Sequence, residues 1–257
     1  MPPVDSDFND HSGRGTEPAV AWIAGVGASA GLGAAVARRF AKEGLIVALT
    51  GRSAERVRAV AAEIAAGGGR ARALPGDVSS AEEVGRIAAE VSALGTLHAA
   101  IFNAGNAVRG TPLELTPEQF EITWRGSTYA GFIFARAALP ALLAGGGGSL
   151  LFTGATASLR GRGPFVAFAA AKAGLRSVAQ SIAREYGRQG VHAAHIVIDG
   201  GIDGERLRTA APHRVAQADA DALLNPEAIA ETYWQLHRQH RSAWTHELDL
   251  RPYKETF

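Results

Sequence analysis

The sequence predicts an α/β fold in which one doubly wound parallel sheet carries helices on both faces. Short apolar runs alternate with amphipathic segments along the chain, a pattern typical of parallel strands joined by crossover helices. The 257 residues are 47% hydrophobic and 20% charged, which is enough for a full core in one domain. No internal repeat or linker divides the chain, so we expect a single domain over residues 18–257.

Turn residues and helix-start signals separate the expected strands. Ser80–Glu83 and Thr116–Gln119 have the spacing of capping boxes, and Asn225 precedes Pro226 at the start of the last helix. The run Gly145–Gly148 is expected to be a loop that leads into a strand. The seven expected strands are Val20–Ala24, Ile46–Thr50, Arg72–Leu74, Ala99–Phe102, Ser149–Thr153, His192–Ile198 and one near Thr245–Leu250.

Composition and the N-terminal sequence limit the possible partners. Residues 1–17 are polar, acidic and rich in proline and glycine, so we expect a disordered extension and not a secretory signal. The net charge of +1 gives no electrostatic reason to expect nucleic acid or an anionic membrane as a partner. No uncharged apolar run approaches the length that crosses a bilayer. We therefore expect a cytoplasmic protein.

The metal-ligating residue types are sparse. The chain has no cysteine, which excludes disulfides, thiolate metal sites and a cysteine nucleophile. His192 and His195 alternate with apolar residues, so we expect histidines that are hydrogen-bonded within a strand and no metal site.

A glycine-rich turn follows the first strand and opens the first helix. Gly27, Gly31 and Gly33 have the spacing G-x-x-x-G-x-G. The first is expected to permit a tight turn, the second to let a pyrophosphate approach the backbone, and the third to allow close helix–strand packing. Unpaired N–H groups at the helix start favour phosphate there. Ser29 and Leu32 belong to the same expected cofactor site.

The end of the second strand bears on which dinucleotide binds. An acidic residue at this point would accept a hydrogen bond from the ribose 2′-hydroxyl of NAD and repel a 2′-phosphate. Gly51 leaves that position without a side chain, and Arg52 can pair with a phosphate. We therefore favour NADP(H) over NAD(H).

Three further segments follow in a recognisable order: Asp77-Val78, Asn103-Ala104-Gly105, and Phe152–Lys172, which reads FTGATASLRGRGPFVAFAAAK. Together with the glycine spacing, they resemble the short-chain dehydrogenase/reductase family from about Ala19 to Ile202. The resemblance implies a Rossmann-type fold that binds a nicotinamide dinucleotide. It also implies that Asp77 and Val78 lie at the adenine and that Asn103-Ala104-Gly105 packs beside the adenosine.

At the reacting end the chain departs from the family's pattern. The family uses a tyrosine acid/base, a lysine that lowers the tyrosine pKa and holds the ribose, a serine that positions the carbonyl, and an asparagine that supports a proton-relay water. Lys172 matches the lysine, whereas Phe168, Ala155 and Ser127 stand at the other three positions. We expect Lys172 to hold the nicotinamide ribose and Thr156 or Ser127 to offer a replacement hydroxyl.

Other hydroxyl groups lie near the same segment. Thr153 and Ser158 flank the expected end of the fifth strand, and Tyr129 is a candidate for a relocated acid. We expect most of these hydroxyls to be structural. After the sixth strand, Gly200 matches a family glycine, and the resemblance implies that Ile202 offers backbone groups to the carboxamide.

The last third of the chain holds the most divergent residues. Asp199 and Gly204 replace a proline and a cofactor-binding threonine of the family, and Asp199 either caps a loop or acts in catalysis. Residues 204–224 are expected to form a substrate lid, and residues 243–257 an atypical C-terminal strand and tail. The arginines of the lid either face an anionic substrate or remain solvated; they are Arg206, Arg208 and Arg214, with His213 beside them.

Three functions remain open at this point. The first is an NADP(H)-dependent oxidoreductase with a non-standard active site that reduces an enoyl or carbonyl substrate. The second is a catalytically silent dinucleotide-binding protein, and the third a lyase or isomerase on the same fold. Small residues over Ala169–Gly174 favour a homodimer or homotetramer packed through that helix, although a helix that lies on its own sheet accepts them equally.

Overall fold

A computed structural model describes residues 17–255 of the chain, so the extension expected at residues 1–17 lies almost entirely outside the described residues. Seven parallel strands form one sheet in the order β3-β2-β1-β4-β5-β6-β7. This doubly wound order confirms the expected fold class. The strands are β1 (Ala19–Ala24), β2 (Ile46–Thr50), β3 (Arg70–Ala73), β4 (Thr96–Phe102), β5 (Gly148–Thr153), β6 (Val191–Ile198) and β7 (Glu247–Leu250).

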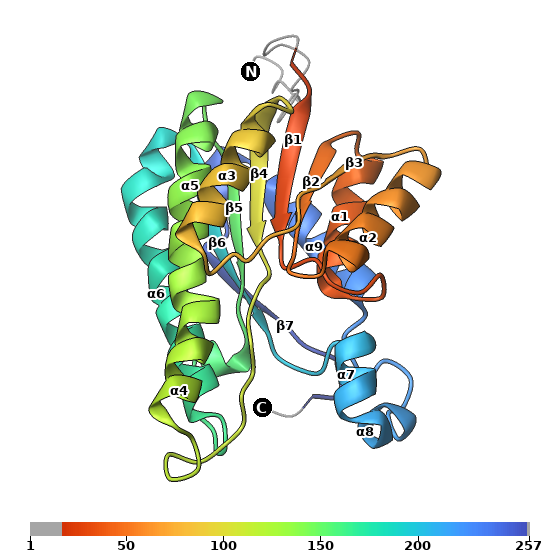
Figure 1. Cartoon of the computed structure of the whole chain (residues 1–257), viewed down its shortest axis with the longest axis vertical. Helices are drawn as coiled ribbons and strands as arrows, with labels where there is room; N and C mark the ends of the chain where they lie inside the picture. The colour runs from red at the N-terminus through yellow and green to blue at the C-terminus, as the bar shows by residue number, and fades with distance from the viewer. Residues whose placement is uncertain (1–16, 256–257) are drawn as a thin grey trace, which may run out of the picture.

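Helices cover both faces of the sheet (Figure 1). The side chains of α1 (Leu32–Lys42), α2 (Ala54–Ala66) and α9 (Pro226–His237) build one apolar core against the strands. Those of α3 (Ala81–Ser92), α5 (Ala130–Ala144) and α6 (Val166–Tyr186) build the other. Because both faces are buried, the central strands are apolar almost throughout, which is why they were readable from the sequence.

All seven expected strands are present, with ends that differ by no more than three residues. The capping box at Thr116–Gln119 forms in full at the start of α4 (Pro117–Trp124), and Asn225 caps α9. The box at Ser80–Glu83 forms only by half. Ser80 accepts from the Glu83 N–H, but the Glu83 carboxylate accepts from the Asp77 N–H at 3.0 Å instead of reaching back to Ser80.

A π-helical turn, η2 (Arg125–Tyr129), joins α4 to α5. The continuous helical stretch Pro117–Ala144 is long and apolar enough to cross a membrane by length and composition, and 44% of its most apolar window is buried. The stretch contains charged residues, among them Arg125 and Arg136, so it is not the uncharged apolar run to which the expectation referred. Core helices of water-soluble proteins pass the same test, and α5 packs against the sheet with Phe134 and Leu142 fully buried.

The region expected to be the lid contains two short helices, α7 (Glu205–Ala210) and α8 (Pro212–Ala216), beside the lower end of the sheet (Figure 1). Short 3-10 turns complete the fold: η3 (Thr156–Ser158), η4 (Gly187–Gln189) and η5 (Arg241–Ala243). The last strand, β7, adds to the sheet edge beside β6, and Pro252 then packs on Gly200.

Candidate active site

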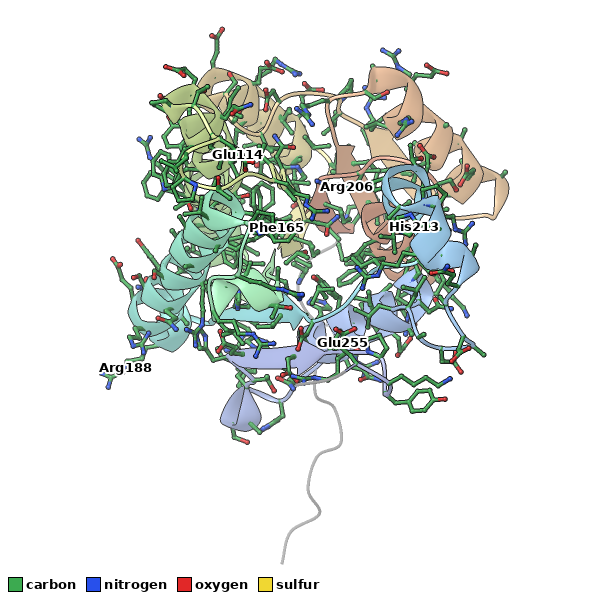
Figure 2. All side chains as sticks on the ribbon, turned by 90° about the horizontal axis from the view of Figure 1, so that it is seen from below. Glu114, Phe165, Arg188, Arg206, His213 and Glu255 are labelled. Carbon is green, nitrogen blue, oxygen red and sulfur yellow. The ribbon has the colours of Figure 1, made fainter. Side chains whose placement is uncertain are left out.

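The candidate site lies at the carboxyl edge of the sheet where the chain order reverses. From β1 the chain winds outward through β2 to β3, and then returns to β4 on the other side of β1. Ligands of open α/β sheets bind at this switch point because the loops after the two strands diverge there. Figure 2 views this edge from below.

The turn after β1 shows why glycines are required. Gly25 has a φ of +89°, and a Cβ at this position would lie 2.5 Å from the carbonyl carbon of Asn103. A Cβ at Gly33 would lie 2.6 Å from the oxygen of Gly25, which agrees with the close helix–strand packing expected there. The glycine with a positive φ in this turn is therefore Gly25, which was not among the expected site residues, whereas Gly27 has no positive φ.

Gly27 has a different property. A Cβ added at this position would meet no atom of the described chain within 4 Å, so the backbone here borders open space. Such space suits the approach of a pyrophosphate to the turn and to the first N–H groups of α1, near Leu32. Gly31 is tighter, since its Cβ would lie 3.0 Å from the oxygen of Ala28.

Ser29 does not present its hydroxyl to this space. Its Oγ donates to the Glu63 carboxylate on α2 at 2.5 Å, and Arg38 donates to the Ser29 carbonyl at 3.0 Å. Arg38 also forms an ion pair with Glu227 on α9 at 2.6 Å. The side chain of Ser29 therefore ties the turn to two helices.

The end of β2 carries an exposed arginine. Arg52 makes no hydrogen bond or ion pair with any residue of the range 17–255, so its guanidinium is available to a ligand. Gly51 is buried, and a Cβ there would lie 2.0 Å from the Val26 oxygen. The lack of a side chain at residue 51 thus has a packing reason as well as the expected one, because the backbone of the phosphate turn crosses that position.

The residues expected near adenosine are held by local hydrogen bonds. One oxygen of Asp77 accepts from the N–H and hydroxyl of Ser79 at 2.8 and 2.7 Å. Val78 is buried behind it. The side-chain amide of Asn103 donates to the Gly25 oxygen at 3.2 Å, so the Asn103-Ala104-Gly105 segment is joined to the glycine turn.

Lys172, Ser127 and Gly105 come together at the reacting end. The Lys172 ammonium is buried and donates to the Thr153 oxygen at 2.7 Å. A Cβ on Gly105 would lie 3.1 Å from the Ser127 Oγ and 3.4 Å from the Lys172 Nζ, which places both side chains beside this glycine. The Ser127 Oγ is buried with no hydrogen-bond partner in the described chain. It can therefore bond a ligand or water.

Burial, and to a smaller extent the positive charge of Arg206, together lower the pKa of Lys172 to about 8. The ammonium lies 5.9 Å from the centroid of the Phe168 ring, one helical turn away on α6. Phe168 is half-buried and has no proton to transfer. Ala155, which ends the loop after β5, donates its backbone N–H to the Ser158 Oγ at 3.1 Å.

The hydroxyls after β5 all have partners. Thr153 shares a hydrogen bond of 2.7 Å with the buried Tyr233, and Ser158 is occupied by Ala155. The Thr156 hydroxyl donates to the Asp199 carboxylate, whose other oxygen lies 3.2 Å from the Arg251 guanidinium. The candidate hydroxyl of Thr156 and the divergent residue Asp199 thus lie in direct contact although they are 43 positions apart in the sequence.

The loop after β6 leads into the lid over the phosphate turn. The Asp199 N–H donates to Leu250, Gly200 packs on Pro252, and the Ile202 oxygen accepts from the Gly204 N–H at 2.8 Å. A Cβ on Gly204 would lie 3.0 Å from the Ala30 oxygen, so the lid begins directly against the glycine turn. The Ile202 carbonyl is therefore already bonded within the loop.

The histidines of β6 are structural, as expected. His195 is fully buried and bonds Glu247 at 3.0 Å, while Arg176 forms two hydrogen bonds to the same carboxylate at 2.6 and 2.7 Å. His192 stacks on Trp244 with ring centroids 4.8 Å apart. Residues 17–255 contain no group of three or more His, Cys, Asp or Glu side chains that could hold a metal ion.

Comparison with known proteins decides the family. The sequence model described as short chain dehydrogenase matches residues 21–214. The chain belongs to this family. A crystal structure of a short-chain dehydrogenase from Rhodopseudomonas palustris is 39% identical, with a TM-score of 0.79 over 91% of this chain and 99% of that one. A metagenomic short-chain oxidoreductase in complex with NADP is 26% identical, with a TM-score of 0.76 over 92% and 98%.

Two curated relatives match a shorter part. An oxidoreductase of Sarocladium schorii is 35% identical over 168 residues, which are 64% of this chain and 66% of that protein. A fatty acyl-CoA reductase of Mycobacterium tuberculosis is 33% identical over 172 residues, 65% of this chain and 58% of that protein. The matched stretch thus spans about two thirds or less of these relatives' lengths.

A nicotinamide dinucleotide fits the residues that are present. The space at Gly27 can receive phosphate, the Arg52 guanidinium has no partner in the described part of the chain, and the buried Ser127 hydroxyl lacks one. These three features lie along the carboxyl edge of the sheet, with Arg52 and Gly27 at the end expected to bind adenosine and phosphate and Ser127 at the reacting end.

Proposed function

We propose that this protein is an NADP(H)-dependent oxidoreductase with a non-standard active site, which reduces an enoyl or carbonyl substrate without a tyrosine acid. The observation that carries the proposal is the Lys172–Ser127–Gly105 cluster, since it brings the lysine expected to hold the ribose and a hydroxyl without a partner in the described chain to the same glycine. When bound, the dinucleotide supplies the hydride.

Lys172 holds the nicotinamide ribose in this proposal. The ammonium donates one of its N–H groups to the Thr153 carbonyl, which fixes its position, and its other N–H groups remain for the ribose hydroxyls. Phe168 closes one side of the ammonium with an aromatic face and excludes water from it. Orientation of the reactants is a large part of such catalysis, so a hydride step to carbon can proceed without a general acid at residue 168.

Ser127 is the better placed of the two expected hydroxyls. Its Oγ is free to donate to a substrate oxygen and polarise it, whereas the Thr156 proton is directed at Asp199. In this proposal, the replacement of the family's residues at positions 168, 155 and 127 changes the route by which the substrate is polarised and does not abolish activity.

NADP(H) is preferred over NAD(H) because of Arg52. The guanidinium is exposed at the end of β2 and can form a bidentate pair with a 2′-phosphate. The NADP complex of the metagenomic relative supports the same cofactor class. The acyl-CoA reductase among the relatives supports an acyl-type substrate.

A homo-oligomer is part of the proposal. Within α6, Ala169 and Ala171 are buried, and a Cβ on Gly174 would lie 2.5 Å from the Thr128 Oγ1. The small residues thus serve packing inside the subunit as much as any contact outside it. Exposed apolar side chains lie instead on α4 and α5, and they are Phe120, Ile122, Trp124 and Phe132.

A catalytically silent dinucleotide-binding protein is the second candidate. Two observations favour it: Phe168 has no ionisable proton to transfer, and the Thr156 hydroxyl already donates to the Asp199 carboxylate. The two readings separate in one experiment. Calorimetric titration with NADPH, NADP⁺, NADH and NAD⁺ is followed by a screen for NADPH oxidation with enals, enoyl thioesters and ketones. Binding with turnover supports the oxidoreductase, binding without turnover supports the silent protein, and no binding rejects both.

A further inference from the structure

Two arginines of the lid, Arg206 and Arg214, have no carboxylate partner among residues 17–255, and of these two Arg206 is the one that bonds Gly105. Arg208 pairs with Asp203 at 2.9 Å, and Glu205 pairs with Arg56 on α2 at 2.8 Å. Arg206, between them, has no carboxylate partner among residues 17–255. Its only hydrogen bond is from Nη1 to the Gly105 oxygen at 3.3 Å, a neutral acceptor.

This contact carries Arg206 across the site. In Figure 2, Arg206 lies on the inner side of the lid, toward the centre of the carboxyl edge, whereas His213 lies further out. Gly105 is also the glycine that borders Lys172 and Ser127. The guanidinium thus reaches the reacting end from the lid, while Lys172 reaches it from α6.

Within residues 17–255, neither Arg206 nor Lys172 forms an ion pair with a carboxylate. The causes of the lowered Lys172 pKa are burial and the charge of Arg206, and no acidic group opposes them. Asp199, the buried acid in the same region, is paired with Arg251 at 3.2 Å. Glu114 is turned to Thr111, whose N–H it accepts at 2.8 Å. The two like charges repel each other, which raises the electrostatic energy of this part of the site.

We propose that Arg206 binds an anionic group of the substrate, a carboxylate, at the reacting end of the site beside Gly105. A carboxylate accepts the planar fork of the guanidinium through two parallel hydrogen bonds and removes the repulsion between Arg206 and Lys172. The Gly105 oxygen then loses its hydrogen bond from Arg206, which is long at 3.3 Å, so its loss changes the free energy little. This assignment rests on the proposed cofactor site and adds the class of substrate.

The position of Arg206 separates this anion from the cofactor phosphates. The lid meets the phosphate turn at Gly204, which borders Ala30. Arg206 bonds the far segment, at Gly105, where Lys172 and Ser127 lie. Its guanidinium is therefore at the nicotinamide end, where a substrate and not a pyrophosphate would be adjacent.

The test measures carboxylate binding without requiring turnover. Protein saturated with NADP⁺ is titrated with benzoate and hexanoate, and with benzamide and hexanamide as neutral counterparts of the same shape. We expect each carboxylate to bind at least about 10-fold tighter than its amide, as a charge-assisted bidentate pair provides. Arg206→Gln should abolish that preference. Arg208→Gln is the matched control, since it removes an equal charge from the same helix and should leave the preference intact.

Three results would overturn the assignment. One is equal binding of acids and amides by the unaltered protein. Another is a carboxylate preference that survives in Arg206→Gln. The third is a loss of NADP⁺ affinity in Arg206→Gln as large as the loss of carboxylate affinity, which would give the guanidinium to a cofactor phosphate. If the unaltered protein binds no dinucleotide, the proposed function fails, and the same titrations on the cofactor-free protein still test Arg206.

Discussion

Removal of the Arg52 guanidinium should change cofactor preference and little else. Arg52 is exposed and has no partner in the described chain, so Arg52→Ala breaks no internal contact and should leave the free energy of unfolding within about 0.5 kcal/mol of the original. A hydrogen bond to a charged group contributes roughly 1.5–3 kcal/mol. Since about 1.4 kcal/mol is a factor of ten, NADPH should bind on the order of 10- to 150-fold more weakly to the variant.

The affinity for NADH, which lacks the 2′-phosphate, should change by less than about 2-fold, apart from a small loss of the general positive field. Calorimetric titration of both cofactors at one ionic strength gives the two ratios. Arg58→Ala is the matched control, because it removes an exposed arginine further along α2. Equal losses for NADPH and NADH, or an equal effect of Arg58→Ala, would refute the assignment of Arg52 to the 2′-phosphate.

The reciprocal experiment, an acidic residue at position 51, is not available to this chain. A Cβ on Gly51 would lie 2.0 Å from the Val26 oxygen and 3.1 Å from a Val57 methyl carbon. The backbone of the phosphate turn would have to move, so Gly51→Asp should damage the fold and the cofactor site together. A switch toward NAD(H) has to be sought at Arg52.

Three further predictions concern charge and chemistry at the site and under it. Folding lowers the pKa of Lys172 from 10.5 to about 8, so between these pH values the folded protein binds fewer protons than the unfolded chain. The free energy of unfolding, measured by denaturant titration relative to Lys172→Met, should therefore rise from pH 8 to 10.5. A difference that does not change with pH would contradict the burial of Lys172. Burial lowers the pKa of His195 from 6.5 to about 4, so stability should fall as pH drops from 6.5 to 4, and less steeply in His195→Gln; equal slopes would contradict this. The double variant Phe168→Tyr with Ala155→Ser should raise the rate of NADPH-dependent ketone reduction by on the order of 10²-fold or more, because a positioned general acid contributes about that much. If the rate does not change while NADPH still binds, the pocket no longer admits a ketone.

The parts of the fold that were predictable are those set by local patterns. The strands of the sheet centre are apolar on both faces, and their alternation with amphipathic segments is visible without any contact map. The cap at Thr116–Gln119 formed because both of its hydrogen bonds are internal to four consecutive residues. The box at Ser80–Glu83 formed by half because a competing donor, the Asp77 N–H, lies within reach of the Glu83 carboxylate.

The same distinction holds for the candidate site. Lys172 and the glycine spacing are recognisable because each depends on a short motif. The contact of Thr156 with Asp199 joins η3 to the end of β6, and it cannot be predicted from the local sequence of either segment. Gly25 was not expected, although a glycine directly after a strand was a usable signal. The need for it comes from Asn103, which follows the neighbouring strand β4.

The sequence alone determined the doubly wound sheet, the phosphate turn and the presence of one lysine without its tyrosine, because these follow from residue type and spacing along the chain. The tertiary structure decided which polar groups are occupied. It directs the Thr156 proton to Asp199, leaves the Ser127 hydroxyl without a partner, and sets Arg206 opposite Lys172 without a carboxylate. Hydrogen bonds and charges act through distances of a few ångströms, and only the folded chain brings residues from β5, β6, α6 and the lid within that range.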